Sequence, residues 1–428
     1  MPHSLTRFGL SLRLFIVGLV TASVSLPMAW ISLGKLLLFV GCLVYFVVTL
    51  KQKRAQDALN TLWSVRLIFV ILAAFAVSLL WTQAPLDMAV TAFVKHSKLL
   101  EVAMLVMLIR TPREARLALL VFGLSQAFFI LSSWVMATGY RVPWATSILI
   151  PQYKAVVYST YLDQTLMFAA TAAVCWHMRR HWPQAAWAAV TLATLAVLAL
   201  ANNLFLQVGK TGYLASLVVL SLAVMWHIPR QWRVVSLMVF PVVMFGLMYA
   251  SSAKFQGKVA QVITESQNYS VQNDNISSSG FRLNAWRRSL QAMAEQPLTG
   301  HGVGSWTLTV KRIEGANANQ VFGDGLSSNP HQEFLLWGVE LGVAGSLLLL
   351  LWVAALVRDA MRFDPPLQRA LISVVAVMVV GCLFNSSLYD ALIGDFFCIT
   401  LGLLLALGVR TDAPLAVSPS PHSNGLPA

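Results

Sequence analysis

The sequence predicts an all-α polytopic membrane protein with about twelve transmembrane helices and one large loop domain on the outer side of the membrane. The chain of 428 residues is 57% hydrophobic and only 11% charged, with a mean hydropathy of +0.70. Apolar runs of about 18 residues or more recur along it, long enough to cross the hydrocarbon core as helices. The alternating strands of a barrel are absent, so helices must satisfy the backbone hydrogen bonds inside the membrane.

The net charge of +13 indicates membrane topology rather than nucleic-acid binding. Lys and Arg recur between alternate spans, as in 51–54, 110–116 and 179–180, and the positive-inside rule assigns such loops to the cytoplasm. Twelve spans with both termini inside keep every short basic loop on one side. The spans are expected at about 10–28, 30–50, 66–83, 97–110, 116–138, 161–178, 185–205, 212–228, 234–251, 331–356, 370–388 and 394–409.

This count divides the chain into four parts. Spans one to nine occupy 1–251, the outer loop domain 252–330, and spans ten to twelve 331–410. An amphipathic helix is expected in the loop domain near 280–295, just after a pair of serines, which are favoured N-caps. The Pro/Ser-rich segment 411–428 is expected to be a disordered cytoplasmic tail.

The junction between the loop domain and the tenth span carries the first candidate active-site residue. Pro330 suits a helix entrance, so His331 is expected at or near the first helical turn, where water meets lipid. Histidine exchanges protons near neutral pH and is a natural general base, although a lone histidine there is more often a hydrogen-bonded cap. On an ideal helix, Gly338, Gly342 and Gly345 fall within about 40° of the face that carries His331. This stripe of glycines suggests a bare groove for a lipid chain.

Two cations on the outer side are candidates for binding a phosphate group. Arg282 falls in the first turn of the amphipathic helix, beside backbone N–H groups without an intrahelical partner. Lys210 falls in the turn between spans seven and eight, where Thr211 can cap the next helix and leave the lysine at its positive end. The alternatives are a solvated surface arginine and an interfacial lysine that reaches lipid headgroups.

Two acids and four cysteines complete the set of reactive side chains. Glu333 and Glu340 lie seven residues apart on another face of the tenth span. An ionisable residue within a span is a functional candidate, so Glu340 is expected to orient a neighbour, bind a partner charge or pack as a paired acid. The cysteines lie in apolar runs without metal-ligand spacing and are expected to be core residues. Other outer carboxylates are scattered, so no metal site is expected.

Motifs in and after the loop domain resemble those of the bacterial O-antigen ligases. The histidine motif of that family is similar to His331-Gln332, nine residues, then Gly342-Val343-Ala344-Gly345. The loop signature that the ligases share with O-antigen polymerases and protein O-oligosaccharyltransferases is similar to Gly280-Phe281-Arg282-Leu283 and to the glycine-rich segment 297–304. The family usually has arginine where this chain has Lys210, and lysine lacks the bidentate fork.

The resemblance implies transfer of a glycan from undecaprenyl pyrophosphate to a lipid A-core sugar, with inversion and without ATP, cofactor or metal. The site would lie on the periplasmic face of the bacterial inner membrane, and the partners would be the lipid-linked O-antigen, lipid A-core and membrane lipids. His331 would remove the acceptor proton, while Arg282 and Lys210 would stabilise the departing pyrophosphate. Possible supporting residues are Gln332, Glu333, Glu340, Gly338, Gly342 and Gly345.

Two other functions remain open at this point. An O-antigen polymerase or a protein O-oligosaccharyltransferase would use the same donor with a different acceptor. A lipid or glycan transporter is a remoter alternative, and it would show discontinuous helices with ionisable groups near mid-membrane.

Overall fold

The computed structural model describes residues 2–49, 61–148, 154–158, 160–179, 181, 186–207, 209–251, 253–267, 278–315 and 328–411. Within these ranges the chain is helical and contains no strand, which confirms the all-α class. The helices up to the loop domain are α1 (Pro2–Ser23), α2 (Met28–Thr49), α4 (Trp63–Ser78), α5 (Leu86–His96), η2 (Ser97–Leu99), α6 (Leu100–Leu108), α7 (Pro112–Ala137), α8 (Tyr161–Met178), α9 (Ala186–Ala201), η4 (Asn202–Leu206), α10 (Lys210–His227), η5 (Arg230–Trp232) and α11 (Arg233–Ser251). The remaining helices are α12 (Ala253–Gln267), α13 (Ser278–Glu295), α14 (Trp306–Glu314), α16 (Glu333–Leu341), α17 (Val343–Ala360), α18 (Pro365–Phe384) and α19 (Ala391–Thr411).

The predicted spans coincide with helices, although their number stays a prediction. Among the described residues, seven helices are long and apolar enough to cross a membrane: α2, α7, α9 with η4, η5 with α11, α17, α18 and α19. Shorter apolar helices occur at Leu12–Ser23 and Trp63–Ser78. These helices make the chain a membrane protein by length and composition. The predicted tail, 412–428, lies outside the described residues.

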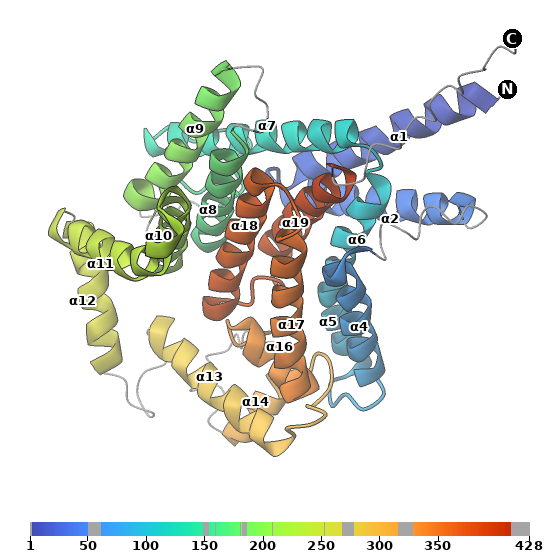
Figure 1. Ribbon diagram of the computed structural model, residues 1–428. Helices are drawn as coiled ribbons and strands as arrows, with labels where there is room; N and C mark the ends of the chain where they lie inside the picture. The colour runs from blue at the N-terminus through green and yellow to red at the C-terminus, as the bar shows by residue number, and fades with distance from the viewer. Residues whose placement is uncertain are drawn as a thin grey trace, which may run out of the picture.

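The C-terminal helices form the centre of the bundle (Figure 1). Helix α19 packs against α6 and α7, while α18 packs against α8, α10 and α17. Nearly all of the apolar window of α19 is buried, whereas α11 has no buried side chain. The four cysteines are free and buried, as predicted for core residues. A central helix buried by protein and an outer helix with an apolar exposed surface are the arrangement expected of a bundle surrounded by lipid.

The described part of the predicted loop domain contains three helices, of which α13 and α14 lie at the bottom of Figure 1 and α12 lies at the left, below α11. Helix α13 lies where the amphipathic helix was predicted. Trp286 and Met293 pack against the core while Leu290 is 57% exposed. Helix α13 rests on α16, so the loop domain is attached to the segment that carries His331.

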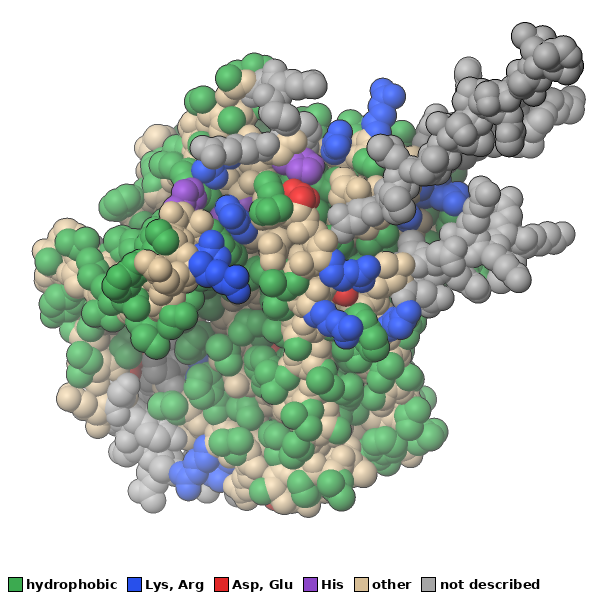
Figure 2. Space-filling view, viewed as in Figure 1, with side chains coloured by type: hydrophobic (Ala, Val, Ile, Leu, Met, Phe, Trp, Pro, Cys, Tyr) green, Lys and Arg blue, Asp and Glu red, His purple; other side chains and the backbone are tan. Residues whose placement is uncertain are grey.

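Basic side chains are distributed unevenly over the surface (Figure 2). In that view Lys and Arg gather in the upper half of the molecule, toward the ends of the helices away from α13 and α14. A smaller basic group lies near the bottom, beside the loop domain. The uneven distribution agrees with the charge asymmetry that the positive-inside rule describes.

The predicted tenth span, 331–356, is wrong as a single helix. Helix α16 ends at Leu341, Gly342 has φ of +70°, and α17 begins at Val343. The segment after α13 packs against this break, where Val343 N donates a hydrogen bond to Pro297 O over 2.8 Å. A Cβ at position 342 would overlap Pro297 O. Glycine at this position allows both the positive φ that ends the helix and the close approach of the Pro297 backbone. A residue with a side chain would be strained by the first and would clash with the second.

Smaller corrections concern the fourth span and two helix starts. The predicted span 97–110 corresponds to the nine-residue helix α6, preceded by η2 and α5. Gly209, not Thr211, is the N-cap of α10, so Lys210 is the first helical residue. Gln332 caps α16, and His331 precedes the helix instead of lying in its first turn.

Candidate active site

His331 stands in a strained loop at the end of the bundle where α13 packs. Its φ is +52°, the only positive φ among the described non-glycine residues. Asn329 supports this conformation, since its Oδ1 accepts a hydrogen bond from His331 N over 2.9 Å. A left-handed conformation costs a residue with a Cβ roughly 1–3 kcal/mol and persists only where the surroundings enforce it. Strain of this kind is common at functional sites, which marks His331 more strongly than its sequence position does.

A chain of hydrogen bonds orients the imidazole. The Nδ1 atom of His331 lies 2.7 Å from Asn385 Oδ1, and Asn385 Nδ2 donates to Asp390 Oδ2 over 2.7 Å. Because a carboxylate accepts from the amide nitrogen of Asn385, the amide oxygen faces His331, and Nδ1 of the ring must donate. In the neutral ring the lone pair is then on Nε2. The arrangement is that of a general base held by a second residue.

Asp390 anchors this chain. Its second oxygen, Oδ1, accepts from Asn329 Nδ2 over 3.4 Å. Burial raises the pKa of Asp390, while the Asn385 hydrogen bond and the nearby His331 and Lys98 charges oppose the rise. The Lys98 ammonium donates to the carbonyls of Tyr389 and Asp390. The polar loop at the end of α18 is therefore fixed from both sides.

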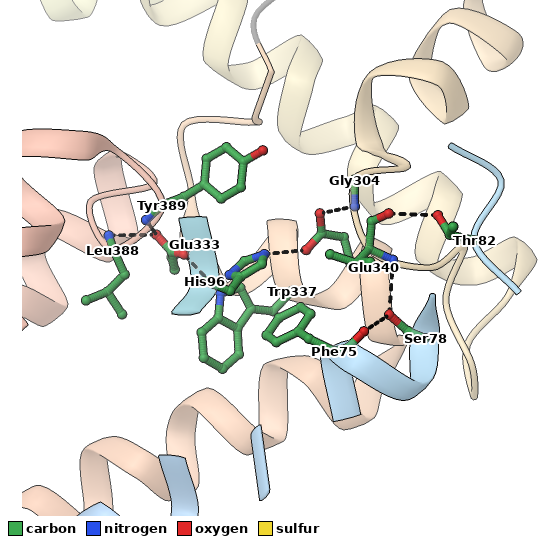
Figure 3. Close-up of polar contacts among 11 residues, drawn as sticks. Phe75, Ser78, Thr82, His96, Gly304, Glu333, Trp337, Glu340, Leu388 and Tyr389 are labelled. Atoms are coloured by element: carbon green, nitrogen blue, oxygen red, sulfur yellow. Dashed lines mark hydrogen bonds and ion pairs between the residues drawn. The ribbon is translucent and has the colours of Figure 1, made fainter. Parts of the chain in front are cut away.

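Glu333 holds the same loop from the N-terminal turn of α16. Its Oε2 accepts from the backbone N–H groups of Leu388 and Tyr389, at 3.0 and 3.3 Å, and its Oε1 accepts from Trp337 Nε1 at 2.9 Å. The side chain is fully buried. Figure 3 shows these bonds on one side of His96 and Glu340 on the other. All its hydrogen-bonding capacity is directed at the framework, so Glu333 supports the site without facing a substrate.

Glu340 joins the tenth span to α5 and to the glycine-rich turn. Its Oε2 lies 2.8 Å from His96 Nε2, and its Oε1 accepts from Gly304 N over 2.7 Å. The His96 ring stacks on Phe75 with centroids 3.9 Å apart. Both members of the pair are buried, and Figure 3 shows aromatic side chains around His96 and the Gly304 backbone beside Glu340. The partner expected for Glu340 is therefore His96, within a structural cluster.

Arg282 lies near the N-terminus of α13, as predicted. The preceding residue, Phe281, packs its ring edge-to-face with that of His331, with centroids 5.7 Å apart. The side chain of Arg282 is partly buried, and burial lowers its pKa, opposed by Tyr161 and Glu265. Its Nε is buried and has no hydrogen-bond partner within the described residues. An arginine donor without a partner can bind an incoming oxyanion.

Lys210 lies at the N-terminus of α10, with its ammonium paired to an acid from the loop domain. Its Nζ is 3.1 Å from Glu265 Oε2. Glu265 also acts electrostatically on Arg282. The two predicted cations therefore belong to one electrostatic group, linked by an acid that the sequence did not single out.

The predicted glycine groove is filled by protein. A Cβ on Gly338 would meet Met293 of α13, and one on Gly345 would meet the backbone of Trp337. These glycines, like Gly342, allow close packing of protein and leave no bare face for a lipid chain. An apolar cavity of about 430 Å³ lies elsewhere, between α8, α9 and α10.

Asn385 and Asn329 were missed from the sequence. The predicted span 370–388 placed Asn385 inside the membrane, whereas α18 ends at Phe384. The polar run Asn385-Ser386-Ser387 after an apolar helix was the available signal, because such residues are costly in lipid and mark a loop or a polar network.

The geometry defines a class: a polytopic helical membrane protein with a histidine-centred polar network and two cations at the end where its loop domain packs. Within the described residues, no three His, Cys, Asp or Glu side chains are grouped to hold a metal ion. Residues 195–350 match the O-antigen ligase family model. The match confirms the resemblance and supports membership of the O-antigen ligase and polymerase superfamily. The matched range contains Lys210, Arg282 and His331. No curated protein matches the chain.

Proposed function

We propose that the protein is an O-antigen ligase, which transfers a glycan from undecaprenyl pyrophosphate to a sugar hydroxyl of lipid A-core. The family match supports glycosyl transfer of the O-antigen ligase or polymerase type. The observation that best supports a catalytic site here is the Asn385 hydrogen bond that leaves Nε2 of His331 with its lone pair. In this proposal the site faces the periplasm, and both termini face the cytoplasm across the inner membrane.

The proposed reaction is a single displacement at the anomeric carbon. The acceptor oxygen attacks that carbon as its proton passes to Nε2 of His331. The bond from the anomeric carbon to the pyrophosphate oxygen breaks, and its electron pair stays with the leaving group, which inverts the configuration. Arg282 and Lys210 stabilise the charge that develops on the pyrophosphate. Because the leaving group is already activated, fixed cations suffice in this mechanism, and no metal is required.

The other predicted residues support the site in this proposal. Gln332 caps α16 through its Oε1, which accepts from Leu335 N. Glu333 and Glu340 fix the loops on either side. Gly338 and Gly342 permit the close approach of Met293 and Pro297, and Gly345 permits the close packing of α17 on α16. None of these six needs to touch the substrate.

Transfer assayed with purified components tests the proposal. The full-length protein in detergent or nanodiscs is given a lipid-pyrophosphate glycan and lipid A-core, with and without EDTA. We expect a product that requires lipid A-core and is unaffected by EDTA. Chain extension without lipid A-core would indicate a polymerase, and transfer to an added pilin-type protein would indicate a protein-directed enzyme. Loss of transfer in EDTA would contradict the metal-free mechanism.

A transporter is the second candidate, because two of its expected features are present. The tenth span is discontinuous at Gly342, and ionisable groups lie within the bundle, where Lys35 Nζ pairs with the buried Asp395 over 2.8 Å. The family match favours the transferase. Protein-dependent movement of the lipid-linked glycan across proteoliposomes, without glycan transfer, would favour the transporter.

A further inference from the structure

The acid that links the two proposed donor-binding cations is Glu265. Its Oε2 is 3.1 Å from Lys210 Nζ, and its Oε1 accepts from Gln261 Nε2 over 2.7 Å. The Lys210 side chain is 31% exposed and the Glu265 side chain 12% exposed. The ion pair therefore lies at a surface that a solute or lipid headgroup can approach.

The cations and the acid stand on elements that are held differently. Helix α10, which carries Lys210, packs against α8 and α18 and buries Tyr213, Ala215 and Val219. Helix α13, which carries Arg282, packs against α16. Helix α12, which carries Glu265, packs against α11 and α13 and is fixed at its start by Phe255, whose ring contacts Tyr213 and Phe245, while Val262 and Ile263 nearer Glu265 are 39% and 50% exposed. An element with few buried apolar contacts can shift at a lower cost than one packed into the core.

We propose that Glu265 is a displaceable counter-ion of the donor site, which holds Lys210 until the donor's pyrophosphate takes its place. This inference rests on the proposed function. A carboxylate and a pyrophosphate compete for the Lys210 ammonium. The pyrophosphate has the larger negative charge and can interact with Lys210 and Arg282 together, so it is attracted more strongly. Displacement leaves Glu265 near an anion of like charge, so the acid lowers the apparent affinity for the donor. Glu265 is thus an affinity-determining residue of the donor site and takes no part in bond making.

Replacement of Glu265 by glutamine tests this inference. Glu265→Gln should lower the donor KM about three- to tenfold, the range given by a partly exposed ion pair of up to about 1 kcal/mol together with relief of like-charge repulsion. Binding of undecaprenyl pyrophosphate without a glycan should tighten by a similar factor. Glu265→Asp keeps the charge on a shorter side chain. Its donor KM should lie between those of the wild type and Glu265→Gln. An unchanged or raised KM in Glu265→Gln would overturn the inference, since a positioning role for Glu265 predicts weaker binding.

Two controls separate this inference from the proposed function. Glu295→Gln removes an acid at the end of α13 that pairs with Arg312 of α14, and it should leave the donor KM unchanged. Lys210→Met should raise the donor KM, and in that background Glu265→Gln should lower it by less than in the wild type, because only the like-charge repulsion is then relieved. If Lys210→Met leaves KM unchanged, the proposed donor role of Lys210 fails. If it raises KM while Glu265→Gln has no effect, only the counter-ion role fails.

Discussion

The candidate site has two halves that the fold holds in different ways. The histidine half consists of Asn329, His331, Asn385 and Asp390, and every link in it is a side-chain hydrogen bond to the next residue. The cation half consists of Lys210, Glu265 and Arg282, where an ion pair lies at the surface and an arginine donor has no hydrogen-bond partner in the described structure.

This difference indicates different tasks for the two halves. A general base must be oriented before the substrate arrives, and the histidine half is fully hydrogen-bonded as it stands. A binding site for a pyrophosphate must keep cations available, and the cation half does so with a partner that can leave. Substitutions in the histidine half should therefore change kcat alone. Substitutions of the cations should raise the donor KM and also lower kcat, because Arg282 and Lys210 stabilise the charge that develops on the pyrophosphate.

Loss of His331 should have the largest effect. His331→Ala should lower kcat about 10²- to 10⁴-fold, the usual contribution of a general base, with the donor KM unchanged. Steady-state transfer from the lipid-pyrophosphate glycan measures both. His227→Ala, an exposed histidine at the C-terminus of α10, is the control and should transfer normally. Wild-type kcat in His331→Ala would remove the general base from the mechanism.

Substitution of Arg282 should have the second-largest effect, mainly on the donor KM. Arg282→Ala removes a charge-assisted hydrogen bond of about 1.5–3 kcal/mol, so the donor KM should rise about 10- to 100-fold. The exposed Arg287 on the same helix provides the control, and Arg287→Ala should stay close to wild type. Equal losses in the two variants would point to a general charge effect and contradict a specific pyrophosphate contact.

Asn385 should have a smaller effect on the histidine half. Asn385→Ala frees the imidazole to rotate and to change tautomer, at a cost of about 1–2 kcal/mol, or roughly a 5- to 30-fold lower kcat. The donor KM should not change, because Asn385 does not touch the cation half in the structure. A raised KM with an unchanged kcat would reverse the assignment of this residue.

Gly338 should affect stability alone. Gly338→Ala places a Cβ against the flexible end of the Met293 side chain and the Ser346 hydroxyl, so the overpacking cost should be small, about 1 kcal/mol, and the thermal midpoint should fall slightly while the donor KM stays the same. Gly123→Ala, in α7 with open space around the new Cβ, is the matched control and should be neutral or slightly stabilising. A raised donor KM in Gly338→Ala would restore the lipid groove that the packing of α13 argues against.

Much of the fold follows from sequence because apolar length and basic loops are local signals. A helix lies at Ser278–Glu295, where the amphipathic helix was predicted, because serine caps and apolar spacing are local signals. The break at Gly342 is different. A glycine in an apolar run is equally consistent with close packing, a lipid groove or a positive φ, and only the approach of Pro297 decides among them.

The site was predictable in its reactive residues and not in its connections. His331, Arg282 and Lys210 stood out by residue type and by position at the outer ends of spans. Asn385 is 54 residues from His331 along the chain, and its hydrogen bond depends on α18 ending at Phe384. Pairings of this kind arise from tertiary packing, which periodicity does not encode.

A double-mutant cycle between His331 and Asn385 tests the central claim most directly. The claim is that Asn385 acts on the reaction only through the imidazole, so the kcat of His331→Ala and of the double variant His331→Ala/Asn385→Ala should be the same. The measurement is the transfer rate at saturating donor and acceptor for the wild type, both single variants and the double variant. Equal rates in His331→Ala and in the double variant would support a base oriented by Asn385. Losses that multiply would contradict the account, because Asn385 would then act independently of His331.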